Sequence, residues 1–420
     1  MLETERSATR KIRLRVLLPT LLLIVLSSLD RVNISFAALQ MNAQLGLTSQ
    51  LYGFAVGIFF VGYLVFQFPS TAILTRVGAR RWITGSIVAW GAIAICMSLV
   101  RNAGQLYVLR FLLGAAESGF APGIVYYVGG WMPQRYRAGA VAISMTAVPV
   151  AVIIGGPLCG WLMSGENLLG VSGWRWMFLM EGVATVVFGL AASLLFVDHP
   201  QAARWLTPVE KEWLSTELAR ESKAAPREEA PFRLVFADAR AWIAAGMWCA
   251  MLVGANGMIF WLPQALKQMS ALSDFAIGVV SALPWIGVAA GMLLNAWHSD
   301  LRQERFWHLA IPLAIAAIAL VAASATSIAS VALLFLLSSG FALGSAQGVF
   351  WAVPTTFLGR SAAASGITLI NLIGNLGSLA GPYAIGWIRS YSHSFAAPVW
   401  FVAAVLVGGA LLIFPLRRRC

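Results

Sequence analysis

The chain has 420 residues, of which 59% are hydrophobic and 11% are charged. Soluble domains carry roughly a quarter charged residues, so these proportions exclude a water-soluble enzyme. The net charge of +12 does not require a nucleic-acid partner, because basic residues in cytoplasmic loops account for it in a membrane protein. We therefore expect a polytopic membrane protein that binds no nucleic acid.

Apolar runs long enough to cross a bilayer recur along the whole chain. Six lie in the first half, near 14–37, 50–74, 82–100, 105–131, 138–163 and 174–197. Six more lie in the second half, near 240–263, 275–298, 307–325, 329–354, 361–388 and 395–416. The sequence predicts an all-α membrane protein with twelve transmembrane helices, six in a bundle formed by 1–197 and six in a bundle formed by 240–420.

A polar stretch, residues 198–239, separates the two sets of runs and is the predicted linker. Thr207, Pro208 and Glu210 have the order of a helix start, with Thr as the cap and Pro at the first helical position. An apolar stripe that begins at Trp213 follows. We expect a short amphipathic helix that lies on the cytoplasmic face and joins the two bundles.

Lysine and arginine are distributed unequally between the two sides of the predicted membrane. With the N-terminus inside, only Arg101, Arg175, Lys267 and Arg389 fall in external segments. The inside set includes Arg76, Arg80, Arg137, Arg227, Arg302, Arg305, Arg360, Arg418 and Arg419. The positive-inside rule then predicts that both termini are cytoplasmic.

The two halves resemble one another at an offset of 225 residues. Arg80 and Trp82 map onto Arg305 and Trp307. In the same way, Gly156-Pro157 on the fifth predicted span maps onto Gly381-Pro382 on the eleventh. Together with the hydropathy pattern, these matches favour a duplicated bundle with parallel repeats, the arrangement of secondary transporters that rock between two states.

Pairs of glycines four residues apart occur on three predicted spans. They are Gly53 and Gly57, Gly156 and Gly160, and Gly377 and Gly381. Such pairs clear one face of a helix, so that a neighbouring backbone can approach closely. Static packing and helices that tighten and loosen as the halves rock both fit this pattern, and the sequence leaves both open.

Five charged residues lie well inside the apolar runs: Asp30, Arg31, Arg110, Glu117 and Glu181. A charge at mid-bilayer costs about 2.5–3.5 kcal/mol on insertion scales, so it persists only beside a cavity or a partner. Arg110 and Glu117 are seven residues apart and share one helix face, about 10.5 Å apart along the axis. The side chains of the adjacent Asp30 and Arg31 diverge, so they cannot both face one partner.

These charges have two interpretations. In the functional one, the arginines attract an anion and the carboxylates carry protons, and this one is favoured because a structural tie could be apolar at lower cost. In the structural one, two salt bridges hold the first and fourth spans together. Glu181 is a separate case, because it follows residues 173–176 at the outer end of the sixth span. We expect it to contact that interfacial segment, and a role in transport is the alternative.

Polar and aromatic side chains on other spans are candidates to complete a binding site: Tyr63, Asn256, Gln347, Trp351, Asn371 and Asn375. Each is also typical of hydrogen bonding between transmembrane helices. Arranged around a cavity, they would supply hydroxyl-binding groups and a flat aromatic wall. Such a lining suits a polyhydroxylated carboxylate better than a cation.

With these residues in view, the chain resembles the anion:cation symporter branch of the major facilitator superfamily, which includes tartrate, phthalate, hexuronate and galactonate permeases. The resemblance extends from about residue 14 to about residue 416. The motifs that carry it are 29–35 on the first span, Tyr63 and 69–70 on the second, 76–82 in the loop that follows, 110–117 with 122–123 on the fourth, 173–176, 203–206, 261–263, 298–300 and 374–377.

The resemblance implies proton-coupled import of a small organic anion, a sugar acid or hydroxycarboxylate, by alternating access. Arg31 would bind the substrate carboxylate, with Tyr63, Asn256, Trp351 and Asn371 lining the site. Asp30, Glu117 and Arg110 would couple transport to protons, and Arg76, Arg80, Asp300 and Arg305 would be gating charges. Two departures from the family pattern are Ser28, where sugar-acid permeases often carry Tyr, and Thr75-Arg76, which replaces an acidic residue common in that loop.

Other functions remain as alternatives. A proton-antiport exporter or a uniporter of organic anions would use the same fold, and a membrane sensor is a further alternative from a different class. The histidines His199, His298, His308 and His393 lie near span ends and lack metal-site spacing, and no nucleophile or zinc motif occurs. We expect no enzyme activity, metal or cofactor, and a monomer in the bacterial inner membrane whose partners are a small carboxylate, protons and membrane lipid.

Overall fold

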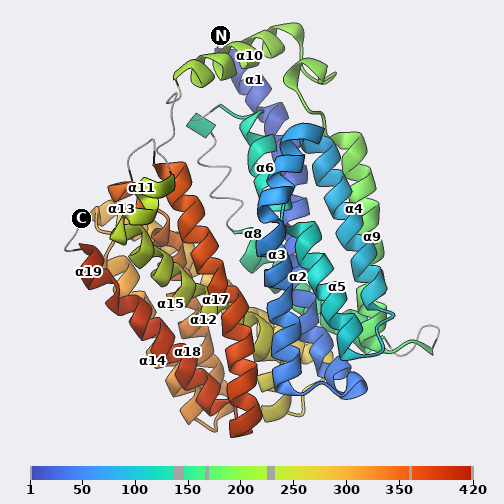
Figure 1. Ribbon diagram of the computed structural model, residues 1–420, viewed down its shortest axis with the longest axis vertical. Coiled ribbons are helices and arrows are strands. Elements are labelled where there is room, and N and C mark those ends of the chain that lie inside the picture. Colours follow the sequence, from blue (N-terminus) through green and yellow to red (C-terminus); the bar gives the residue numbers. More distant parts are fainter. Residues whose placement is uncertain are drawn as a thin grey trace.

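The computed structural model describes residues 2–133, 135–136, 146–165, 170–224, 232–358 and 362–417. These residues form helices and connecting segments without any strand, so the all-α prediction is confirmed (Figure 1). By length and composition, ten helices in the described residues can cross a membrane. Two further predicted spans correspond to α4 (Ala79–Met97) and α17 (Ala363–Ser392), long helices that pack against α9 and α12.

The first half of the chain begins with α1 (Leu2–Ile12), which continues through a π-helical turn, Arg13–Leu17, into α2 (Leu18–Leu45). The other helices of this half are α3 (Ser49–Val77), α4, α5 (Ala103–Glu117), α6 (Phe120–Gly129), α8 (Ala147–Ser164) and α9 (Gly173–Leu195). We call α2–α9 the N-terminal bundle; of these helices, α3 and α8 also pack extensively on α17 and α13 of the second half.

The predicted linker contains the expected helix, α10 (Pro208–Ala224), preceded by a short turn, Pro200–Ala202, and followed by α11 (Phe232–Ala237). The cap is reciprocal: the Glu210 amide donates to Thr207 Oγ1 at 3.3 Å, and the Thr207 amide donates to Glu210 Oε2 at 2.8 Å. Glu210 also accepts hydrogen bonds from Ser7 and Lys11 of α1. The linker helix is therefore fastened to the N-terminal bundle.

The second half contains α12 (Ala239–Met269), α13 (Asp274–Arg302), α14 (Trp307–Ala325), α15 (Ala329–Phe350), α16 (Pro354–Phe357), α17, α18 (Ala396–Leu411) and α19 (Ile413–Arg417). We call α12–α18 the C-terminal bundle. Figure 1 shows the two bundles side by side, with α10 above one end of the N-terminal bundle. We call that end of the molecule the linker end and the opposite end the remote end.

The fourth predicted span is not one continuous helix. It divides into α5 and α6 at Ser118 and Gly119, immediately after Glu117. Pro122 explains the break, because it has no amide hydrogen to donate to the Ser118 carbonyl and its ring crowds that turn. The buried Glu117 carboxyl group therefore lies where α5 ends and the chain turns into α6.

Glycines bring the two bundles into backbone contact near the remote end. A Cβ atom added to Gly53 of α3 would lie 2.7 Å from the Pro382 carbonyl oxygen of α17. A Cβ atom added to Gly156 of α8 would lie 2.4 Å from the Gly278 carbonyl oxygen of α13. The offset of 225 residues carries Gly53 onto Gly278, so the two contacts are counterparts of one another.

Hydrogen bonds join the bundles at the same end. Gln40 of α2 donates to Asp274 of α13 at 2.7 Å, and the Tyr52 hydroxyl donates to the Phe260 carbonyl at 3.0 Å. Asn42 donates to Gln264 at 3.2 Å. In Figure 1, α3 and α17 lie closest at the remote end and diverge toward the linker end.

The predicted orientation in the membrane remains a prediction. Several of the basic residues on which it depends lie outside the described residues: Arg137, Arg227, Arg360, Arg418 and Arg419.

Candidate functional site

The side chains of Asp30 and Arg31 point in different directions from α2, as expected, and they bond to different helices. The Arg31 Nε donates to Glu117 Oε2 of α5 at 2.6 Å. Asp30 Oδ2 instead accepts from Trp90 Nε1 of α4 and Thr185 Oγ1 of α9, both at 3.0 Å. Of the two salt bridges in the structural interpretation, only the one between Arg31 and Glu117 occurs among the described residues.

Arg31 differs from the other buried charges because it is accessible. Its side chain is 30% exposed, whereas Glu117 is fully buried. The guanidinium carbon lies 5.8 Å from the Phe59 ring centre and 5.2 Å from that of Tyr63, both on α3. Aromatic faces stabilise a cation without neutralising it. Arg31 is therefore held between these rings and Glu117 while part of its side chain stays accessible.

Arg110 is fully buried on α5, seven residues before Glu117. Its Nε donates to the Ala55 carbonyl at 3.2 Å, and its guanidinium carbon lies 4.8 Å from the Phe59 ring centre. Within the described part of the chain, its two terminal nitrogens and Glu117 Oε1 have no hydrogen-bond partner. Donor capacity on Arg110 and acceptor capacity on Glu117 thus remain unused within one helix, α5.

The expectation for Glu181 is wrong. Its carboxyl group does not contact residues 173–176 but accepts from Asn33 Nδ2 at 2.9 Å and from Cys159 Sγ at 3.2 Å. Arg175 of the interfacial segment instead donates to the Ser98 carbonyl at 2.6 Å and lies over the Trp174 ring. Glu181 belongs to the interior of the N-terminal bundle.

Sequence reasoning missed the partners of the two inward-facing carboxyl groups. A signal was present, because Asp30 and Asn33 are one turn apart on α2, and Glu181 and Thr185 are one turn apart on α9. Polar residues at that spacing share a helix face. Two such faces oppose each other, with Thr185 on Asp30 and Asn33 on Glu181.

The candidate lining residues of the C-terminal bundle make contacts within that bundle. Asn256 is buried, and its Nδ2 donates to Ser378 Oγ of α17 at 2.9 Å. Asn371 Oδ1 accepts from Asn375 Nδ2 at 2.9 Å. Trp351 lies just beyond α15, 5.0 Å from the Trp248 ring. Among the described residues, no hydrogen bond or ion pair joins this set to Arg31.

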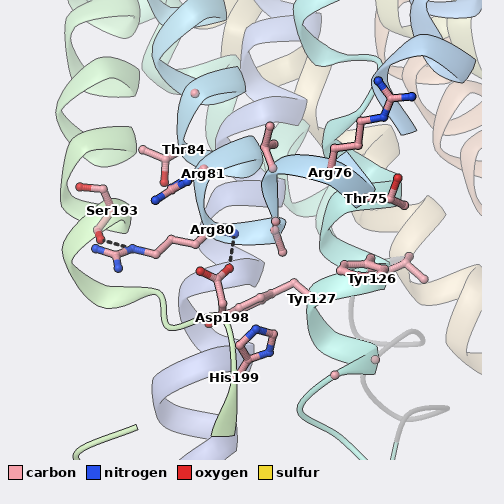
Figure 2. A pocket seen from close by; sticks show the side chains of 17 residues that line it. Thr75, Arg76, Arg80, Arg81, Thr84, Tyr126, Tyr127, Ser193, Asp198 and His199 are labelled. Carbon is pink, nitrogen blue, oxygen red and sulfur yellow. Dashed lines mark hydrogen bonds between the residues drawn. The ribbon is translucent and has the colours of Figure 1, made fainter. Parts of the chain in front are cut away.

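Two of the predicted gating charges lie at the linker end of the N-terminal bundle. Arg76 and Arg80 line a cavity of about 1210 Å³ where α3 and α4 meet α6 and the end of α9 (Figure 2). The Arg80 amide donates to Asp198 Oδ1 and its Nε donates to the Ser193 carbonyl, both at 2.9 Å. Figure 2 shows the Arg76 side chain pointing away from this group.

The equivalent loop of the C-terminal bundle contains its own acidic partner. Arg305 forms an ion pair with Asp300 at 2.6 Å and also donates to Ser299 Oγ at 2.8 Å. In the first half, where Thr75-Arg76 replaces the acidic residue, Asp198 from beyond α9 accepts from the Arg80 backbone amide, while the Arg80 guanidinium donates to the Ser193 carbonyl. Arg80 and Arg305 therefore each contact residues of their own half in this structure.

Comparisons with known proteins place these features in a family. Residues 20–382 match the family model of the Major Facilitator Superfamily. A candidate tartrate transporter from Agrobacterium vitis is 39% identical over 416 residues, which cover 99% of this chain and 96% of that protein. NicT, a candidate metabolite transport protein from Pseudomonas putida, is 35% identical over 394 residues, covering 93% and 90% of the two chains.

Solved structures show the same fold. A bacterial homologue of the human lysosomal transporter Spinster, in an inward-facing and occupied conformation, superposes with a TM-score of 0.80. That chain is 19% identical, and the superposition covers 97% of each chain. The resemblance drawn from the motifs is confirmed at the level of the superfamily, and the relatives' names are consistent with its anion:cation symporter branch.

Proposed function

The chain belongs to the major facilitator superfamily, and we propose that it is a proton-coupled symporter that imports a small organic anion by alternating access. We place it as a multi-pass monomer in the bacterial inner membrane, with both termini in the cytoplasm. Under this proposal the linker end is cytoplasmic, and the structure is the state in which the bundles are joined at the periplasmic end.

A single observation carries the proposal. Arg31 is the intramembrane cation with a substantially exposed side chain, and a carboxylate on another helix holds it at 2.6 Å. A transported carboxylate binds a guanidinium through the same charge-assisted hydrogen bonds that Glu117 makes now. Substrate and Glu117 therefore compete for one group.

Protonation decides this competition. While Glu117 is ionised, it occupies Arg31. A proton taken up from the acidic periplasm neutralises Glu117 and releases the guanidinium for the incoming carboxylate. Arg31 is then paired with the substrate, so the cavity closes without burying either charge alone. Opening to the more alkaline cytoplasm removes the proton, and ionised Glu117 displaces the substrate.

Arg110 and Asp30 complete the coupling set. The unused terminal nitrogens of Arg110 lie on the same helix as Glu117, and we assign Arg110 the role of attracting that carboxylate when the substrate occupies Arg31. Asp30 is the second titratable group of the cycle. Arg76, Arg80, Asp300 and Arg305 are assigned to the cytoplasmic gate, where they exchange partners between states.

The proposed substrate is a hydroxylated carboxylate such as an aldonate, a uronate or tartrate. The name of the Agrobacterium vitis relative supports this class, because tartrate bears both carboxylate and hydroxyl groups. Tyr63, Asn256, Trp351 and Asn371 would bind the hydroxyl groups and the carbon skeleton once the bundles close on Arg31. Loss of an aromatic ring at Ser28 would leave room on that side of the site.

Reconstitution into proteoliposomes tests the proposal. Labelled tartrate, galactonate and glucuronate are offered outside at acidic pH, with an alkaline interior. We expect at least one of them to accumulate above its external concentration, and a protonophore to abolish the accumulation. Vesicles with Arg31→Ala and a neutral sugar as solute are the controls. Accumulation only with an acidic interior would indicate antiport, and equilibration insensitive to the gradient would indicate a uniporter.

A further inference from the structure

The proposed cycle leaves one buried acid unused. Glu181 of α9 is 8% exposed and lies in the interior of the N-terminal bundle, opposite Asp30 and Asn33 of α2. Asp30 is 1% exposed. Two hydrogen bonds join these helices in opposite senses, from Thr185 to Asp30 and from Asn33 to Glu181. The two carboxyl groups thus form one buried cluster between α2 and α9.

Every described group that donates a hydrogen bond to the two carboxyl groups is neutral. Trp90 of α4 and Thr185 of α9 donate to Asp30, while Asn33 of α2 and Cys159 of α8 donate to Glu181. On the neighbouring α5 and on α2, Arg31 pairs with Glu117, and no ion pair to Asp30 or Glu181 occurs in the described residues. An ionised carboxylate in such a place carries a large desolvation cost.

The side-chain carbonyl oxygen of Asn33 lacks a hydrogen-bond donor in the described part of the chain. Asn33 is 1% exposed, and its Oδ1 has no donor among the described residues. Its Nδ2 is the atom that donates to Glu181. A buried carbonyl oxygen without a donor is unfavourable. Asp30 is one turn before Asn33 on α2, so protonation of Asp30 would put an O–H donor on the same helix face as this oxygen.

The Cys159 thiol can hydrogen-bond to Glu181 in both protonation states of that carboxyl group. Its thiol now donates to Glu181 Oε1 at 3.2 Å. A thiol is both a weak donor and a weak acceptor, so it can accept from Glu181 once Oε1 carries a proton. The amide nitrogen of Asn33 can only donate, which assigns the exchangeable proton to the oxygen that faces Cys159.

Glu181 also lies nearer to the remote end than Asp30 does. It is eight residues from Gly173, where α9 begins, which is about 12 Å along the helix axis. Asp30 lies 15 residues from Leu45, where α2 ends, which is about 22 Å. A proton that enters from the remote end therefore reaches Glu181 before Asp30.

We propose that Glu181 is a further proton-carrying residue of the transport cycle, which takes a proton from water at the remote end and is coupled to Asp30 through the hydrogen bonds that join α2 and α9. The proton moves from hydronium to Glu181 Oε1, leaving water, and returns to water when the cluster opens to the other side. This proposal rests on the proposed function, because it requires that transport is proton-coupled.

The test compares Glu181→Gln with Glu181→Asp in proteoliposomes. Gln keeps nearly the same volume and still accepts from Asn33, but it cannot carry a proton. We expect Glu181→Gln to lose accumulation driven by a pH gradient while it still exchanges labelled for unlabelled substrate. Glu181→Asp, which keeps a titratable group, should restore accumulation with a shifted pH profile. A purely structural role would not shift that profile.

Each outcome decides the matter. Wild-type accumulation together with an unchanged pH profile in both variants would overturn the assignment of Glu181 while leaving the proposed function intact. If the wild type itself shows no proton coupling, the proposed function fails first. If Glu181→Gln does not fold, the pH profile of Glu181→Asp carries the test alone: a shift supports the proposal, and an unchanged profile rejects it.

Discussion

The two bundles share a packing scheme but differ in their chemistry. Asp30 and Arg31 of the N-terminal bundle correspond, at the offset of 225 residues, to Ala255 and Asn256 of the C-terminal bundle. The helix of the second half that corresponds to α5 and α6 is α15, and its segment Ala329–Phe350 contains no charged residue. All five charges that lie well inside the apolar runs belong to one half.

This difference separates the positions that build the scaffold from those to which we assign substrate binding and proton coupling. The glycine contacts are two-fold related, because Gly53 against α17 and Gly278 against α8 place the same residue type at matching positions. The charges have no such counterpart. A rocking carrier needs matching surfaces in both halves, but one set of titratable groups is sufficient to couple it to protons.

The strongest test of this asymmetry truncates the side chains at two matched positions, Arg31 and Asn256, and compares the losses of affinity. Arg31→Ala should weaken substrate binding by about 2–5 kcal/mol, at least about thirtyfold, because it leaves Glu117 unpaired and removes the anion partner. Asn256→Ala should cost about 0.5–1.5 kcal/mol, the value of one neutral hydrogen bond. Calorimetric titration of the purified protein measures both.

Arg31→Lys is the matched control. It should recover little affinity, since a single ammonium cannot form the two parallel hydrogen bonds that a guanidinium offers a carboxylate. Equal losses in Arg31→Ala and Asn256→Ala would contradict the division of labour between the bundles.

The next largest effect concerns Glu117. Glu117→Gln mimics the protonated state at nearly constant volume, so it should bind substrate and exchange it across the membrane. Net uptake driven by a pH gradient should be lost, because the empty carrier cannot release its proton. Exchange and gradient-driven uptake are measured on the same vesicles. Full accumulation by this variant would return Glu117 to the role of a structural salt bridge.

A third prediction tests the symmetry of the scaffold. Gly53→Ala and Gly278→Ala should each destabilise the closed remote end by about 1–3 kcal/mol, because the new methyl group meets a backbone oxygen. Both variants should shift the population toward the state open at that end. The labelling rate of cysteines introduced at the remote end measures this shift. Gly85→Ala is the control, because nothing lies within 4 Å of its added Cβ. Different responses at Gly53 and Gly278 would argue against matched contacts.

The smallest expected effect lies in the linker. Burial raises the pKa of Glu210, but hydrogen bonds from Lys11, from the Thr207 amide and from Ser7 outweigh it and lower the pKa from 4.5 to about 2. A lowered pKa means that the contact stabilises the fold above pH 4.5 and is lost as the pH falls toward 2. Glu210→Gln should lower the melting temperature by about 1–3 °C at pH 7. The difference should shrink below pH 4.5, and a constant difference would exclude an electrostatic origin.

The sequence was sufficient for the spans, the duplication and the cap of α10, because each depends on local periodicity or on residues a few positions apart. Divergence of Asp30 and Arg31 followed from helix geometry alone. The partners of Glu181 did not, since Asn33 and Cys159 come from helices far away in the chain. Nor did the hydrogen bond from the Arg80 backbone amide to Asp198, which depends on how the chain leaves α9.

The sequence contains Pro122, but it does not show that the helix divides there. Proline is tolerated within long membrane helices, as Pro69 of α3 and Pro382 of α17 are here. Whether it bends a helix or divides it depends on the packing around the freed carbonyl. Next to the freed Ser118 carbonyl, the Gly119 carbonyl accepts from Trp82 Nε1 at 3.1 Å, and the Ser70 and Ser118 hydroxyls share a hydrogen bond of 2.7 Å.

The two glycine contacts also define a lever. From Gly57 to Val77, α3 extends for about 30 Å beyond the contact zone, so each degree of rotation about that zone displaces the linker end by about 0.5 Å. The same rotation moves the glycines themselves hardly at all. A small rotation at the glycine contacts therefore produces a large displacement at the linker end. Because Glu210 bonds to Lys11 of α1, α10 moves together with the N-terminal bundle.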